Sequence, residues 1–107
     1  MSDPRTAIII VHWRHLDETL GCLGSWPRAT DILPIVVDNG GTAPVAAHVA
    51  QAMPAARVLR SERNLGYAGG NNVGLRWALT SGADYVLLLN DDALVSAQKA
   101  GKTRVIA

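Results

Sequence analysis

Four apolar runs recur along the chain, separated by stretches in which apolar residues are spaced as they are in helices. The runs cover residues 7–12, 32–38, 56–60 and 84–90. Three of them are rich in Ile, Val or Leu and do not alternate with polar residues, which is typical of strands covered on both faces. The pattern therefore predicts four strands of a mainly parallel sheet.

Two helices are predicted before the third strand. The segment 16–26 has leucines at helical spacing, and Asp17 and Glu18 in its first turn favour the helix dipole. The segment 43–52 is rich in alanine, has two valines at helical spacing, and ends before Pro54. Both segments therefore predict helices that cross from one strand to the next.

A third helix is predicted at 69–81, where Val73, Trp77 and Thr80 lie along one side and Gly82 supplies a stop. Strands and helices thus alternate, which predicts a doubly wound α/β fold with helices on both faces of the sheet. Right-handed crossovers leave few arrangements, and we expect the strand order 3-2-1-4. In such sheets ligands bind beyond the carboxyl ends of the strands, where the order reverses.

Composition narrows the range of partners and locations. The 107 residues are 49% hydrophobic and 18% charged with a formal net charge of +1, which gives no general attraction to nucleic acid or an anionic membrane. Cys22 is the only cysteine, which excludes an internal disulfide, and the first residues lack a signal-peptide pattern. The longest apolar runs are far shorter than the roughly 20 residues that cross a bilayer. We therefore expect a cytoplasmic protein without a transmembrane segment, with the inner face of the membrane as an alternative location.

The whole chain, 1–107, is expected to form a single domain. Its core is predicted at 7–95, and the mixed, positively charged tail at 96–107 carries no assignment.

Polar residues follow the predicted strands at the edge where such sheets bind ligands. Asn90, Asp91 and Asp92 follow the fourth strand, and adjacent carboxylates repel each other unless a cation or hydrogen-bond donors compensate. Magnesium or manganese, held by one or two carboxylates with water and a substrate phosphate, is suited to this role. The alternative is that Asp91 or Asp92 caps a following helix.

The first two strands also end in residues that could contact a ligand. Asp38 precedes the turn 39–41, which exposes backbone amides; it is either part of a plain turn or an acceptor for a base or ribose. After the first strand, Trp13 is suited to stacking on a base and Arg14 to meeting a phosphate. His12 is either structural or, like Trp13, a contact to the ligand.

Residues 63–74, RNLGYAGGNNVG, are rich in glycine and asparagine. The glycines do not have the spacing of the dinucleotide-binding fingerprint, and no P-loop sequence is present. They could let the backbone approach a ligand, with amides at the start of the third helix favouring phosphate. Close packing of the helix on the sheet at Gly70 and Gly74 is the other interpretation, and the two are compatible.

In this order, the segments IIIVHW, IVVDNGG, RNLGYAGGNNVG and YVLLLNDDA resemble the inverting family 2 glycosyltransferases of GT-A fold, particularly the rhamnosyltransferase-like members. The resemblance spans residues 7 to about 95. It implies a Rossmann-like nucleotide-sugar-binding domain that transfers a hexosyl or deoxyhexosyl group to an acceptor hydroxyl. The donor would be a UDP, dTDP or GDP sugar, with Mn²⁺ or Mg²⁺ on its diphosphate.

The resemblance also implies roles for individual residues. Asp38 matches the aspartate that contacts the base. Four further residues match the asparagine and glycine motif beside the nucleotide: Asn64, Gly66, Asn72 and Gly74.

The segment 90–92 matches the DxD position of the family, with Asn90 in place of the usual first aspartate. Asp91 would lie near the ribose or sugar, and Asp92 would coordinate the metal. His12 and Trp13 complete the predicted nucleotide-sugar-binding set.

Members of the family are considerably longer than this chain, and no candidate for the catalytic base is found in it. We therefore expect the nucleotide-binding part of such an enzyme, and the alternative is a non-catalytic nucleotide-binding or assembly module. An exposed edge at the fourth strand would invite pairing, which predicts a homo-oligomer.

Overall fold

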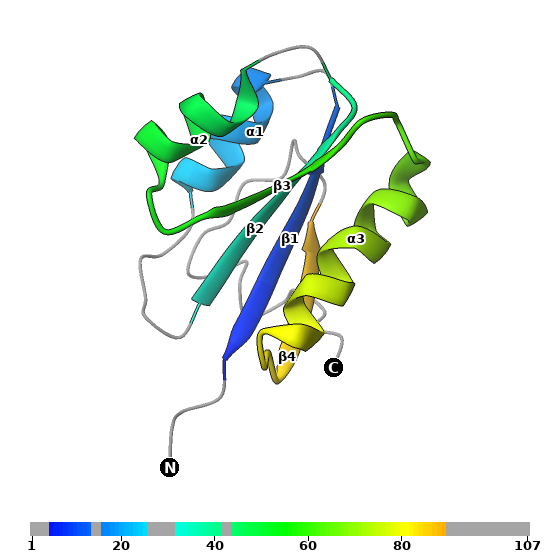
Figure 1. Cartoon of the computed structure of the whole chain (residues 1–107). Coiled ribbons are helices and arrows are strands. Elements are labelled where there is room, and N and C mark those ends of the chain that lie inside the picture. The colour runs from blue at the N-terminus through cyan, green and yellow to red at the C-terminus, as the bar shows by residue number, and fades with distance from the viewer. Residues whose placement is uncertain (1–4, 14–15, 26–31, 42–43, 90–107) are drawn as a thin grey trace.

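The computed structural model of the chain describes residues 5–13, 16–25, 32–41 and 44–89 (Figure 1). The four strands are β1 (Thr6–His12), β2 (Ile32–Asn39), β3 (Arg57–Ser61) and β4 (Tyr85–Leu89). The three helices are α1 (Leu16–Gly24), α2 (Val45–Ala52) and α3 (Gly66–Thr80). Every predicted element within the described residues is therefore present, with ends that differ by a few residues.

The strands form one parallel sheet in the order β3-β2-β1-β4. This confirms the predicted doubly wound topology, in which the chain moves outward from β1 to β3 and then returns to the other side of β1. The carboxyl ends of β1 and β2 lie side by side, because His12 is in register with Asp38. The point where the strand order reverses is at β1.

Helices cover both faces of the sheet. Figure 1 shows α1 and α2 together on one face and α3 on the other. On the α1–α2 face, one core cluster contains Ile8, Ile10 and Val36 of the central strands. On the α3 face, a second cluster contains Ile9 and Val37. The central strands are thus apolar on both sides, which explains why their sequences do not alternate.

The sheet-facing side of α3 is made of its smallest residues. A Cβ added at Gly70 would lie 2.7 Å from Val11 Cγ1, and one added at Gly74 would lie 2.7 Å from Ile9 Cγ2. Ala78 continues this side one turn further and is fully buried. The glycines therefore let α3 lie close against β1, as the packing interpretation of Gly70 and Gly74 expected.

Two details of the predicted third helix are wrong. The helix begins at Gly66 rather than at residue 69, and Thr80 is exposed at its end. Trp77 lies at the flank rather than at the centre of the buried side, with its ring 5.4 Å from the Arg57 guanidinium on β3. The glycine side of α3 faces the sheet because it lets the helix approach more closely than a large aromatic ring would.

Among the described residues, no helix combines the length and the apolar character needed to cross a membrane.

Candidate functional site

The strand register aligns three polar residues at the carboxyl edge of the sheet. His12 on β1 pairs with Asp38 on β2, and Asp38 pairs with Arg60 on β3. Residues in register on neighbouring strands point to the same face. These three point to the α1–α2 face, because each is two residues after a member of the apolar cluster on that face.

Asp38 is the buried acidic residue of this aligned set. It is 3% exposed, and its Oδ2 accepts a hydrogen bond from Arg60 Nη1 at 2.5 Å. Its other oxygen, Oδ1, is buried and has no hydrogen-bond partner among the described residues. A buried carboxylate oxygen without a donor is costly, so this atom marks a place where a ligand could donate.

Arg60 is held at two points. Besides its ion pair with Asp38, its Nη2 donates to the carbonyl oxygen of Gly41 at 3.2 Å. Its side chain is nevertheless 56% exposed. The guanidinium is thus fixed in orientation while part of it still faces outward.

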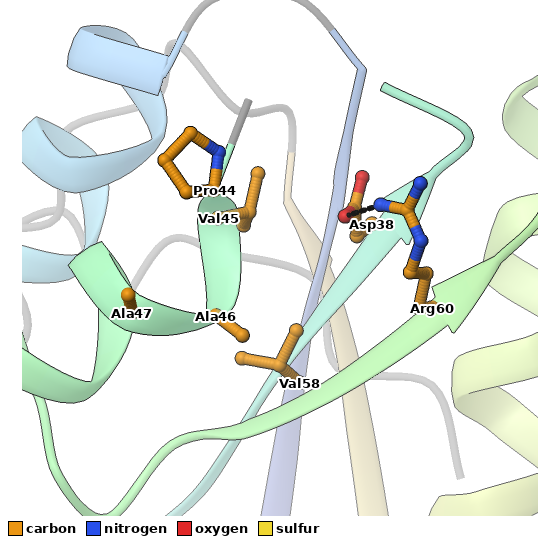
Figure 2. Close-up of a pocket in the computed structure, with 7 residues that line it drawn as sticks. All are labelled: Asp38, Pro44, Val45, Ala46, Ala47, Val58 and Arg60. Atoms are coloured by element: carbon orange, nitrogen blue, oxygen red, sulfur yellow. Dashed lines mark hydrogen bonds and ion pairs between the residues drawn. The ribbon is translucent and has the colours of Figure 1, made fainter. Parts of the chain in front are cut away.

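A cavity of about 310 Å³ adjoins this pair. Its polar lining residues are Asp38 and Arg60, and its apolar wall comes from the start of α2 and from β3 (Figure 2). The apolar lining residues are Pro44, Val45, Ala46, Ala47 and Val58. A mostly apolar lining with a few polar groups that fix orientation is typical of small-molecule sites.

His12 lies inside the fold. It is fully buried, and its Nδ1 is 2.6 Å from Oγ1 of Thr19 on α1. The contact ties the end of β1 to α1, which is the structural role considered for it from the sequence.

Trp13, which follows His12, is 40% exposed. Its carbonyl oxygen lies beside Gly41, where an added Cβ would be only 2.5 Å from that oxygen. The turn after β2 and the end of β1 are therefore in close contact, and the side chain of Trp13 stands at the same edge as Asp38.

Asn39 joins the turn after β2 to the loop before α3. It is 2% exposed, its Nδ2 donates to Asn64 Oδ1 and to the Gly66 carbonyl, and its Oδ1 accepts from the Leu65 amide, each at 3.0 Å. Asn64 Oδ1 also accepts from the Gly66 amide at 2.8 Å. Asn39 was not among the predicted site residues, because an asparagine before two glycines is typical of any turn.

Two glycines allow this junction to form. Gly40 has a φ of +85°, and a Cβ there would lie 2.4 Å from the backbone carbon of Arg63. Gly66 has a φ of +76°, a conformation that residues with a side chain rarely adopt. The predicted residues Asn64 and Gly66 are thus brought to the same edge as Asp38, as parts of one hydrogen-bonded loop.

The two neighbouring asparagines of α3 differ in environment. Asn72, the predicted contact, is exposed. Asn71 is 4% exposed, and its Oδ1 has no hydrogen-bond partner among the described residues. Because Trp77 marks the β3 flank of the helix, helical spacing places Asn71 on the opposite flank, towards β4. The sequence pattern alone did not distinguish these two residues.

The segment Asn90–Asp92 lies outside the described residues. The strand that leads to it ends at Leu89, which is in register with Ile10 of β1. The described residues contain no group of three or more His, Cys, Asp or Glu side chains that could hold a metal ion. The prediction of Asp92 as a metal ligand therefore stays a prediction.

Comparison with known sequences identifies related proteins. Residues 8–103 match the family described as Glycosyl transferase family 2. The chain is 42% identical over 96 residues to the galactofuranosyltransferase GlfT1 of Mycobacterium tuberculosis (strain H37Rv), an alignment that covers 86% of this chain and 31% of that protein. The galactofuranosyltransferase GlfT1 of Mycolicibacterium smegmatis is 39% identical over 88 residues, which cover 80% of this chain and 29% of that protein. The chain thus spans about a third of the length of these relatives.

Solved structures share the fold. TarS 1-349 from S. aureus in complex with UDP matches with a TM-score of 0.72 and 21% identity over 92% of this chain and 30% of that one. The mannosyltransferase PcManGT from Pyrobaculum calidifontis, in complex with GDP-Man and Mn²⁺, matches with a TM-score of 0.71 and 21% identity over 96% of this chain and 32% of that one. At this identity the likeness establishes the GT-A nucleotide-sugar transferase fold.

Proposed function

The chain belongs to glycosyl transferase family 2, and on that basis we propose that it binds a nucleotide-diphosphate sugar as the donor for transfer to an acceptor hydroxyl. The observation that carries the proposal is the buried Oδ1 of Asp38, which has no partner within the described part of the chain and lies beside an apolar-walled cavity at the carboxyl edge of the sheet. This edge is where open α/β sheets bind their ligands.

The described residues suggest how the nucleotide is held. The base enters the cavity and donates to Asp38, while Trp13 stands exposed at the same edge. The loop at Asn64 and Gly66 leads into the start of α3, where backbone amides favour the diphosphate.

The metal belongs to the proposal as well. Asp92 would hold a divalent cation on the diphosphate, with Asp91 towards the ribose or sugar and Asn90 as a weaker, neutral neighbour. Such an ion would offset the negative charge on the departing diphosphate. We assign no catalytic base among the described residues.

For the transferred sugar, we infer a galactofuranosyl group. The relatives that are 42% and 39% identical to the chain are galactofuranosyltransferases. These relatives replace the rhamnosyltransferase-like members as the guide within the family, and they narrow the predicted hexosyl or deoxyhexosyl group to a galactofuranosyl group.

The proposal is tested by calorimetric titration of the chain with UDP, dTDP and GDP, each with Mn²⁺ and again with a chelator. We expect binding of at least one nucleotide, and binding that weakens at least tenfold when the metal is removed. The variant Asp92→Asn, measured with Mn²⁺, should behave like the chelated protein. If no nucleotide binds in the presence of the metal, the proposal fails and the non-catalytic assembly module is favoured.

A further inference from the structure

The interaction between Arg60 and Asp38 changes what the carboxylate can offer a ligand. A carboxylate by itself presents two acceptor oxygens side by side. Here Oδ2 accepts from Arg60 Nη1, and Oδ1 has no partner among the described residues. Figure 2 shows the ion pair between Arg60 and one of the two oxygens of Asp38. Asp38 therefore has one oxygen open to a ligand, while its other oxygen is already engaged by the guanidinium.

The guanidinium supplies the complementary group. Its two contacts, to Asp38 Oδ2 and to the Gly41 carbonyl, fix the plane of the fork. Arg60 also lines the cavity and is 56% exposed, so other N–H groups of the fork face the space a ligand would enter. The end of the cavity thus presents an acceptor and a donor next to each other.

Uracil and guanine present different hydrogen-bonding groups to this end of the cavity. Uracil has one ring N–H between two carbonyl oxygens, so it matches one acceptor beside one donor. Guanine has two neighbouring N–H donors, at N1 and at the exocyclic amine, and a carboxylate pairs best with both when each of its oxygens accepts one of them. With Arg60 against Oδ2, the second guanine donor would compete with the guanidinium for that oxygen, which weakens the pairing of guanine with Asp38.

We propose that Arg60 is the residue that selects the base of the donor: it donates to a carbonyl oxygen of the base and, by occupying Asp38 Oδ2, favours the imide edge of uracil over guanine. The inference rests on the proposed function, because it concerns the base of the same nucleotide. Nothing in the family resemblance assigns Arg60 a role.

The test compares UDP with GDP by calorimetric titration in the presence of Mn²⁺, on the complete chain and its variants. We expect the unaltered chain to bind UDP about tenfold more tightly than GDP, as the weakening of one hydrogen bond to a charged acceptor implies. In Arg60→Met, which keeps an unbranched apolar stem, UDP binding should weaken about tenfold and GDP binding should hold or improve. The ratio of the two dissociation constants should therefore approach one.

The matched control is Arg57→Met on the same strand. The Arg57 guanidinium lies over Trp77 of α3, on the opposite face of the sheet from the cavity. This variant removes the same charge and should keep the UDP to GDP ratio of the unaltered chain. Circular dichroism verifies folding. If Arg60→Met does not fold, Arg60→Lys replaces it, since lysine keeps the charge beside Asp38 but lacks the planar fork. In that variant the preference for UDP over GDP should fall at least threefold.

Two results would overturn the inference while the proposed function stands. One is equal binding of UDP and GDP by the unaltered chain, and the other is an unchanged ratio in the folded Arg60 variant. Absence of binding by any nucleotide would overturn both proposals.

Discussion

Asp38 and Asn39 are neighbours at the end of β2, and they turn to opposite faces of the sheet. Asp38 faces the cavity on the α1–α2 side, where one of its oxygens has no described partner. Asn39 faces α3 and is fully engaged with the loop at residues 64–66. Asp38 therefore carries an unmet hydrogen-bonding capacity that suits a ligand, whereas Asn39 holds the surrounding backbone in place.

This division predicts that Asp38→Asn affects binding more than stability. The variant removes the charge that pairs with the largely exposed Arg60, and such pairs contribute about 1 kcal/mol or less to stability. A hydrogen bond to a charged acceptor is roughly twice as strong as one to a neutral acceptor. We expect about tenfold weaker UDP binding in calorimetry, with the free energy of unfolding in urea changed by about 1 kcal/mol or less. An unchanged dissociation constant would remove Asp38 from the site.

Asn39→Ala is expected to lower stability rather than to act directly on binding. The substitution leaves the Leu65 amide without its acceptor and removes two donated hydrogen bonds, so the free energy of unfolding should fall by about 1–3 kcal/mol. Amide hydrogen exchange at residues 64–66 should become faster. The control Asn72→Ala alters an exposed residue and should change stability by about 0.5 kcal/mol or less. Equal stability of the two variants would contradict the role assigned to Asn39.

The sequence predicts some of these residues and not others for a physical reason. Asp38 is recognisable because a charged residue ends an apolar strand. Arg60 is 22 residues away from it, and the ion pair depends on the register between β2 and β3, which local patterns do not encode. Asn39 is similarly indistinct, because an asparagine before two glycines is typical of any turn.

At the scale of elements, α3 shows both the strength and the limit of local patterns. Its existence follows from helical spacing, but its first turn contains glycines, which are poor helix formers. The structure starts the helix at Gly66 because Asn39 and Asn64 bind the backbone of the preceding loop. Tertiary hydrogen bonds thus outweigh propensity at this end of the helix.

The close packing of α3 predicts opposite effects for two glycine substitutions. A methyl group at Gly74 would lie 2.7 Å from Ile9 Cγ2, so Gly74→Ala should force a shift and lower the free energy of unfolding by about 1–3 kcal/mol. Gly21 is exposed within α1, and a Cβ added there would have no atom within 4 Å. Gly21→Ala should therefore raise the free energy of unfolding by about 0.5–1 kcal/mol. Urea unfolding of both variants measures the difference. A neutral Gly74→Ala would show that α3 can move away from β1 without cost.

At the scale of the whole molecule, the sheet has two unequal edges. The β3 edge carries the exposed residues Arg57 and Arg60, and charged side chains discourage a strand from pairing with another copy. Among the described residues, β4 pairs only with β1, and its side chains are apolar or aromatic. Any association of two sheets is therefore favoured at β4 rather than at β3.

We accordingly predict that the chain forms a dimer through β4. Sedimentation velocity over a range of concentrations should show a species of twice the monomer mass. Leu88→Lys places a charge on a half-buried position of this strand and should shift the equilibrium to monomer, since inward-pointing charges oppose edge pairing. The control is Leu79→Lys on α3, where the leucine is 67% exposed and belongs to no strand; it should leave the dimer intact. If the Leu79 variant loses the dimer and the folded Leu88 variant keeps it, the interface lies on α3. If the unaltered chain is a monodisperse monomer, the predicted association is refuted.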